Sequence, residues 1–100
     1  MDEFTQSIYT NLYYVPSGRV ITYGQLATLA GFPNHSRHVG KVLSKLPKDT
    51  QLPWYRVVNA QGKISLIGDK FEKQRKLLEE EGILIREDGL IFHFKQVVMP

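Results

Sequence analysis

The sequence predicts an α+β fold, a small and mainly helical domain with a helix-turn-helix of the winged-helix kind and short β-hairpins. Three observations support this prediction. Apolar residues recur at helical spacing in the first half, two short helical segments meet at a Gly-Phe-Pro-Asn turn, and glycine-containing turns follow in the second half. A length of 100 residues, with 42% hydrophobic and 23% charged residues, predicts one domain over residues 1–100.

The amino-terminal part predicts two helices. Residues 4–13 carry apolar side chains at helical spacing, and the Pro-Ser-Gly turn at 16–18 ends this segment. The next segment, "TYGQLATLAG", has both of its ends marked. Thr22 and Gln25 have the spacing of a capping box, and Gly31 supplies a C-terminal stop. We therefore expect a short second helix between these residues.

The segment "SRHVGKVLSKLP" predicts an amphipathic helix with a basic outer face. Its apolar positions recur at i, i+3, i+4 and i+7, and they are Val39, Val42, Leu43 and Leu46. The opposite side carries Arg37, Lys41 and Ser44, with Lys45 at its edge. We expect Asn34 or Ser36 to cap the start of this helix and Pro47 to end it.

The basic face of this helix favours binding to DNA. Lys41 and Lys45 can each neutralise one phosphate, and the helix N-terminus offers free N–H groups to another. Arg37, in the first turn, is best placed to enter a groove. The same stripe is also typical of a solvated helix face, so this helix alone leaves both interpretations open.

The second half predicts a hairpin, a helix and two strand segments. Residues 56–65 predict a hairpin whose valines and isoleucine flank an Asn-Ala-Gln-Gly turn. A helix is expected from about Lys70 to Glu81, with Asp69 as its N-cap and Gly82 closing it. The tail "ILIREDGLIFHF" predicts two strand segments around a Glu-Asp-Gly turn.

Composition excludes several classes of chemistry. The sequence has no cysteine, so disulfides, thiolate catalysis and cysteine-ligated metal centres are excluded. His35 and His38 lack the i, i+4 spacing of a helical metal pair, and we expect neither a metal nor a cofactor. No signal-peptide pattern or membrane-length apolar run is present, which predicts a cytoplasmic protein, nucleoid-associated if bacterial, without a membrane partner. We also expect a monomer. The formal net charge of +3 is mild.

Four stretches carry a resemblance to a known family: "VPSGRVITYGQLATLAG", "SRHVG", "PWYRVVNAQGKIS" and "LLEEEG". In this order they resemble the carboxy-terminal domain of methylated-DNA–protein cysteine methyltransferases, the O6-alkylguanine-DNA alkyltransferases. The family reads Pro-Cys-His-Arg-Val where this chain has Pro53 to Val57. Trp54 stands at the position of the nucleophilic Cys and Tyr55 at that of the His, and Glu81 matches the acid partner. The chain therefore looks like an alkyltransferase-like protein, which lacks transferase activity.

The resemblance implies a function and a set of residues. It implies a non-enzymatic sensor that docks in the minor groove, flips O6-alkylguanine out of duplex DNA and flags the lesion for nucleotide excision repair proteins. Arg37 matches the intercalating finger, Tyr23 the tyrosine that rotates the target phosphate, and Gly40 a small residue for close approach. The expected DNA-binding set is Tyr23, Ser36, Arg37, Gly40, Lys41, Ser44 and Lys45. The expected lesion pocket is Pro53, Trp54, Tyr55, Arg56, Ser65 and Gly68, and Arg56 is expected mainly to buttress the loop.

Two departures from the family and two rival functions qualify this prediction. The Asn-Pro hinge is here Leu46-Pro47, and the segment that covers the base is "SLIG" at 65–68, so this less polar lid is expected to accept bulkier O6 adducts. A winged helix-turn-helix regulator would bind undamaged DNA instead. An enzyme would need another nucleophile, for which Tyr55 is the candidate, although a phenol is largely protonated at neutral pH.

Overall fold

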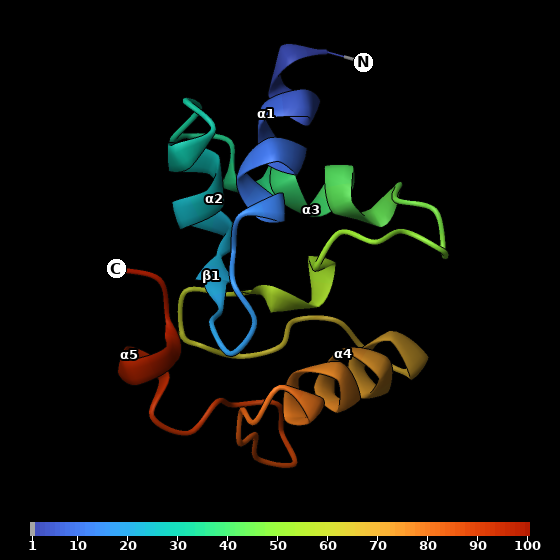
Figure 1. Ribbon diagram of the computed structural model, residues 1–100, viewed down its shortest axis with the longest axis vertical. Helices are drawn as coiled ribbons and strands as arrows, with labels where there is room; N and C mark the ends of the chain where they lie inside the picture. Colours follow the sequence, from blue (N-terminus) through green and yellow to red (C-terminus); the bar gives the residue numbers. More distant parts are fainter. Residues whose placement is uncertain (1) are drawn as a thin grey trace.

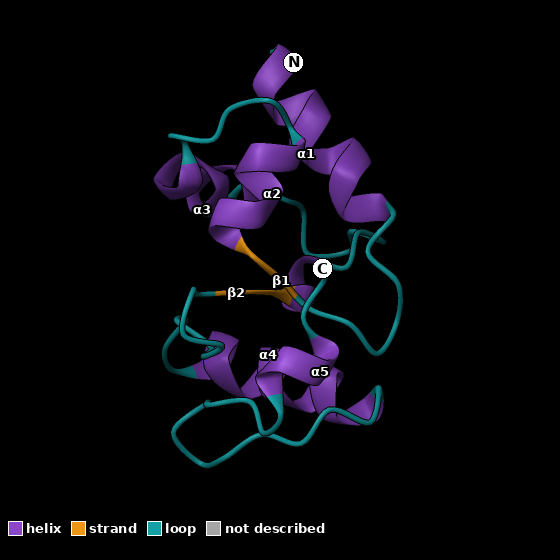
Figure 2. Cartoon of the chain, turned by 90° about the vertical axis from the view of Figure 1, so that its left-hand side faces the viewer, coloured by secondary structure: helices purple, strands orange, loops and turns teal. Residues whose placement is uncertain are grey.

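The computed structural model describes residues 2–100 and confirms the α+β class. Its elements in chain order are α1 (Glu3–Tyr13), β1 (Ile21–Thr22), α2 (Tyr23–Leu29), α3 (Ser36–Ser44), the 3-10 turn η1 (Trp54–Arg56), β2 (Val57–Val58), α4 (Asp69–Glu80) and α5 (Phe94–Val97). Helices α1 to α3 lie on one side of the β1–β2 pair, and α4 and α5 lie on the other (Figures 1 and 2). The two strands therefore join two helical layers.

The first two helices form as predicted because their ends are set by local hydrogen bonds. The carboxylate of Asp2 accepts a bond from the Thr5 N–H and caps α1. In α2 the capping box is complete, since the Gln25 N–H donates to Thr22 Oγ1 (3.0 Å) and the Thr22 N–H donates to Gln25 Oε1 (2.9 Å). Gly31 follows with φ +90°, a conformation that glycine adopts without strain.

Helix α3 lies where it was predicted and stops before Pro47, but its predicted N-cap is wrong. The N-cap residue is His35, which makes no side-chain capping bond, and Ser36 is already the first helical residue. The His35 N–H donates to the Phe32 carbonyl (3.0 Å), so the turn after α2 sets the start. The helix ends at Ser44, ahead of Pro47, and Leu46 lies beyond it.

The predicted hairpin over 56–65 is wrong in its pairing. The turn forms, since the Gly62 N–H donates to the Asn59 carbonyl (3.0 Å). Strand β2, however, pairs in parallel with β1, in the register Ile21↔Val57 and Thr22↔Val58. Val57 and Val58 are buried between the two helical layers. Parallel strands are usually covered on both faces, so this burial fits the pairing of β2 with β1 at the centre of the fold.

Helix α4 and the tail differ in detail from their predictions. Asp69 is the first helical residue, and the N-cap is Gly68, whose φ of +65° and ψ of −138° suit a residue without a side chain. The predicted turn in the tail is confirmed, because the Gly89 N–H donates to the Arg86 carbonyl (2.9 Å). On either side of this turn, Ile85 and Ile91 form an antiparallel β-bridge. The short helix α5 that follows was not predicted, and Val98 bridges Val20.

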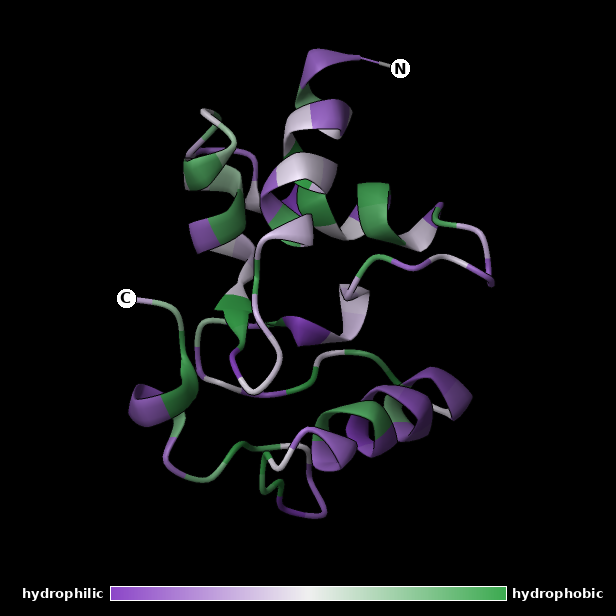
Figure 3. Ribbon diagram, in the orientation of Figure 1, coloured by the Kyte–Doolittle hydropathy of each residue, from purple (hydrophilic) through white to green (hydrophobic). Residues whose placement is uncertain are grey.

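The core consists of two clusters, one on each side of the strand pair. The first gathers the apolar faces of α1, α2 and α3 and includes Ile8, Leu12 and Leu26, all fully buried. The second lies between β2, α4 and the tail and includes Val58 and Leu78. Apolar faces turn inward and the outer side of α4 is hydrophilic (Figure 3). Within residues 2–100, no helix has the length and apolar content that crossing a bilayer requires.

Candidate nucleic-acid interface

Helix α3 presents a basic face that is free to meet an anion. Ser36, Arg37, Lys41 and Lys45 are all exposed. Among residues 2–100, the ion pairs join other residues, and none involves Arg37, Lys41 or Lys45. The Ser44 hydroxyl donates to the Lys41 carbonyl (2.7 Å) at the end of the helix. Because these cations have no internal partner, they can neutralise phosphates without first breaking an ion pair.

The two histidines at the start of α3 belong to an aromatic cluster. The rings of His35 and His38 lie 5.1 Å apart, and the Phe4 and Phe32 rings meet edge to face at 5.1 Å. Phe4 also contacts both histidine rings. The cluster ties α1 to the first turn of α3, the turn that carries Arg37. In the described part of the chain, no group of three or more potential metal ligands occurs.

A cavity of about 600 Å³ lies beside α3. Its lining residues are Tyr23, Gly40, Leu43, Ser44, Leu46, Pro47, Lys48, Thr50, Trp54, Val57, Leu66, Asp69, Lys70, Lys73 and Gln74. The helix-turn-helix, η1 and the first turns of α4 thus contribute to one concave site. Its size falls in the range of roughly 300–1,000 Å³ that is usual for small-ligand pockets.

Gly40 forms part of this cavity wall and packs on Tyr23. A Cβ atom built at Gly40 would lie 4.0 Å from the Tyr23 ring, which is ordinary van der Waals contact. The fold therefore does not require a glycine at this position. Packing within the folded chain therefore leaves room for a small side chain on this part of α3.

The adjacent aromatic residues Trp54 and Tyr55 lie in different environments, Trp54 at the cavity and Tyr55 against the core. Trp54 lines the cavity and meets the Tyr55 ring edge to face, with centroids 5.7 Å apart. Tyr55 packs on the second core cluster, and the Arg56 guanidinium lies 5.4 Å from its ring centroid. Burial raises the pKa of Tyr55 above its ordinary value, despite the opposing charge of Arg56. The phenol therefore stays protonated and is a poor nucleophile.

Arg56 anchors η1 from behind and does not line the cavity. Its Nε donates to both carboxylate oxygens of Glu81 (3.0 and 3.1 Å), and its Nη1 donates to the Val15 carbonyl (2.7 Å). The Gly18 N–H also donates to Glu81 (3.0 Å). Burial acts to raise the pKa of Glu81, but the bonds from Arg56 and Gly18 outweigh it and lower that pKa. The pair locks three segments together behind Trp54.

Gln74 also holds the turn that carries Trp54, and sequence reasoning missed it. Its side chain is 1% exposed, and its Nε2 donates to the carbonyls of Tyr55 (3.0 Å) and Val57 (2.9 Å). The available signal was its position on α4, on the same face as Phe71 and Leu78. A polar residue at a core position of an amphipathic helix indicates buried hydrogen bonds.

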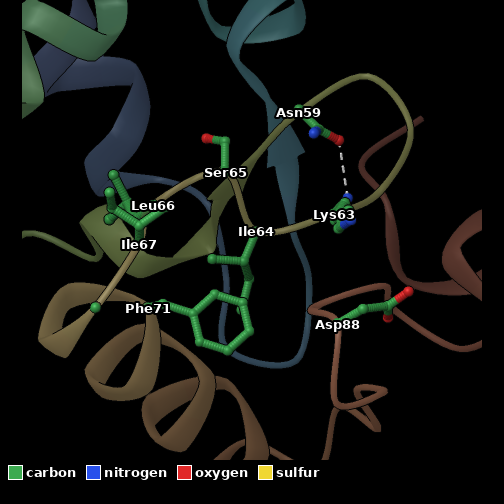
Figure 4. A pocket seen from close by; sticks show the side chains of 9 residues that line it. Asn59, Lys63, Ile64, Ser65, Leu66, Ile67, Phe71 and Asp88 are labelled. Carbon is green, nitrogen blue, oxygen red and sulfur yellow. Dashed lines mark hydrogen bonds between the residues drawn. The ribbon is translucent and has the colours of Figure 1, made fainter.

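The predicted pocket residues are only partly brought together. Tyr23, Gly40, Ser44 and Trp54 share the cavity beside α3, whereas Pro53 is buried next to it. Ser65 and Gly68 line a second, more open cavity of about 510 Å³ instead. Figure 4 shows Ser65 among the labelled residues of this cavity.

The segment 65–68 separates the two cavities. Leu66 lines both of them. The Ser65 and Tyr23 hydroxyls are hydrogen-bonded at 3.2 Å, which ties this segment to α2. It therefore lies where it can form one edge of the Trp54 cavity.

Fold and site define a class of protein, a helix-turn-helix domain with an aromatic-walled cavity beside its second helix. The family model described as "6-O-methylguanine DNA methyltransferase, DNA binding domain" matches residues 3–83. The chain therefore belongs to that family.

Three comparisons place it among individual relatives. It is 48% identical over 91 residues to a DNA base-flipping protein of Vibrio parahaemolyticus, covering 91% of each chain. It is 39% identical over 92 residues to alkyltransferase-like protein 1 of Schizosaccharomyces pombe, covering 90% of this chain and 85% of that protein. The solved structure of S. pombe Atl1 in complex with damaged DNA containing O6-carboxymethylguanine superposes with a TM-score of 0.88, at 34% identity, over 100% of this chain and 97% of that one.

Proposed function

We propose that this chain is a non-enzymatic sensor of O6-alkylguanine in duplex DNA. One observation carries the proposal. Trp54 forms a wall of the cavity beside the basic helix α3. In the stretch Pro53 to Val57, which resembles the methyltransferase motif, Trp54 stands at the position of the nucleophilic Cys. The sequence contains no cysteine that could replace it. The names of the relatives and the DNA-bound structure of S. pombe Atl1 support this proposal.

Binding begins with α3 in the minor groove. Lys41 and Lys45 contact phosphates, and Gly40 lets the helix approach the backbone closely because it has no side chain there. Arg37 enters the base stack when the damaged nucleotide leaves. Its guanidinium can stack on the neighbouring base pairs and donate to the orphaned base while it stays charged.

The extruded base then enters the cavity beside Trp54. Tyr23 holds the rotated phosphate from the edge of the same cavity. Extrusion costs a few kcal/mol of unstacking and unpairing, and it costs least for a base that already pairs poorly. This lower cost of extrusion favours the damaged base over intact bases before any contact with the pocket forms. The bound complex then marks the site for nucleotide excision repair proteins.

A titration of duplexes with and without a single O6-methylguanine tests the proposal. We expect tighter binding to the damaged duplex by fluorescence anisotropy, together with a change in emission from Trp54, the one tryptophan of the sequence. Mass spectrometry after incubation should detect no added methyl group on the protein. Equal affinity for both duplexes favours a transcription regulator, and a mass increment of one methyl group indicates an enzyme.

The Arg37→Ala variant tests the intercalating role. We expect it to lose most of its preference for the damaged duplex, because no side chain then fills the gap in the stack. Arg86→Ala is the matched control, since Arg86 is also exposed but lies on the hairpin after α4, where it pairs with Asp88. If Arg37→Ala binds the damaged duplex with wild-type affinity, Arg37 does not act as the intercalating residue.

A further inference from the structure

The cavity beside α3 is larger than a guanine base needs. Guanine has eleven heavy atoms, and even at the ~30 Å³ that one molecule of liquid water occupies, it fills only about 330 Å³. The cavity holds about 600 Å³. If the proposed function is correct, the remaining space takes the substituent on O6 together with solvent.

The charged residues that line the cavity are predominantly basic. Three lysines line the cavity, Lys48 from the segment after α3 and Lys70 and Lys73 from the first turns of α4, against one acid, Asp69. All three lysines are exposed at the rim. Among residues 2–100, none of them takes part in an ion pair, so Asp69 does not neutralise any of them directly.

These lysines are separate from the basic face of α3. They belong to two segments distant in the sequence, and what they share is the cavity. The amino-terminal end of α4, a helix of 12 residues, adds a partial positive charge on the same side, which the first-turn acids Asp69 and Glu72 partly offset. A neutral alkyl group gains no electrostatic attraction from cations at the rim, whereas an anionic substituent does.

We propose that Lys48, Lys70 and Lys73 form an anion-selective subsite, which makes the pocket prefer O6 adducts whose substituent carries a negative charge. This inference rests on the proposed function and names the class of lesion within it. The negative charge comes from the adduct itself, such as a carboxylate, and not from the DNA backbone. Each exposed lysine contributes a small attraction, about a two- to fivefold gain in affinity.

The test compares two adducts of equal size. O6-carboxymethylguanine and O6-carbamoylmethylguanine have the same number of heavy atoms, but only the first is charged. Affinities are measured on otherwise identical duplexes at one ionic strength. We expect the wild-type protein to bind the carboxymethyl duplex roughly tenfold more tightly, as several such contacts combine. The ratio should approach one in the triple variant Lys48→Gln, Lys70→Gln and Lys73→Gln.

Lys76→Gln is the matched control, because Lys76 is an exposed lysine of the same helix that does not line the cavity. It should keep the wild-type ratio. Equal wild-type affinity for both adducts would overturn the subsite, as would a ratio that survives the triple substitution. A loss of affinity that is the same for both adducts in the triple variant would show that the lysines contact phosphates, and would overturn it too.

The affinity for a duplex that contains O6-methylguanine distinguishes a failure of the subsite from a failure of the proposed function. A protein that binds the methyl lesion selectively but treats the two larger adducts alike retains the proposed function and lacks the subsite. A protein that prefers none of the three lesions over intact duplex has neither.

Discussion

The ion pair between Arg56 and Glu81 predicts a measurable coupling between the turn that carries Trp54 and the end of α4. Both side chains are nearly buried, at 14% and 11% exposure, and the carboxylate accepts bonds from Arg56 and from the Gly18 N–H. Glu81→Leu leaves the guanidinium without its partner. Breaking a buried pair in this way costs roughly 3–5 kcal/mol, and the residual exposure places this pair at the lower end, about 3 kcal/mol.

Thermal and urea unfolding measure this cost. At about 4–8 °C per kcal/mol for a domain of this size, the Tm of Glu81→Leu should fall by about 12–24 °C. The assay is a double-mutant cycle with Arg56→Met, Glu81→Leu and the combined variant. Replacing both residues removes the unpaired charge, so the double variant should lose less than the sum of the single variants, with a coupling of at least about 1.5 kcal/mol.

The pH dependence gives an independent measure of the same pair. The folded-state pKa of Glu81 is lowered, so its contribution is fully present above the unfolded value of about 4.3 and is lost as the pH falls through the lower folded value. The stability difference between wild type and Glu81→Leu should therefore shrink on acidification from pH 7 to pH 3. Two results would refute the stabilising role of the Arg56–Glu81 pair. One is that the stability losses of the two single variants add up to that of the double variant within about 0.5 kcal/mol. The other is that the stability difference between wild type and Glu81→Leu does not change with pH.

Three further predictions concern the interface. Gly40→Ala should stabilise α3 by up to about 1 kcal/mol in thermal unfolding, yet weaken binding to damaged duplex in anisotropy, whereas unchanged affinity would contradict the close approach of α3 to DNA. Gln74→Met should cost about 2 kcal/mol in urea unfolding, since the carbonyls of Tyr55 and Val57 lose their donor, and wild-type stability would mean that water replaces it. Lys41→Ala should lower the slope of log affinity against log salt by about 0.9, and an unchanged slope would place Lys41 away from phosphates.

Features that depend on neighbours a few residues away were readable from the sequence. The capping box of Thr22 and Gln25, the stop at Gly31 and the turn at Gly89 all form where predicted. In each case the interaction closes within a few residues, so the residue types alone specify it. The basic face of α3 was equally visible, because helical periodicity assigns residues to a face before any packing is known.

Predictions failed where the deciding partner lies far away in the chain. Val57 and Val58 were expected to pair across their own turn, but they pair with Ile21 and Thr22, because burial between the two helical layers outweighs the local hairpin. The cap of α3 was also misplaced, since the turn after α2 sets it. Short strands carry no local mark of their partner, so only the packed fold selects the pairing.

The candidate site divides along the same line. The sequence by itself determined that no cysteine nucleophile exists, that Trp54 stands at its position in the family's motif, and that α3 carries a cationic face. The support of the loop by Arg56 was expected, but only the tertiary structure decided that Glu81 is its partner. The structure alone also decided that Gln74 holds the turn from α4, and that Lys48, Lys70 and Lys73 line one cavity. Composition and motif are properties of the chain, whereas a cavity exists only where segments distant in sequence pack together and leave space between them.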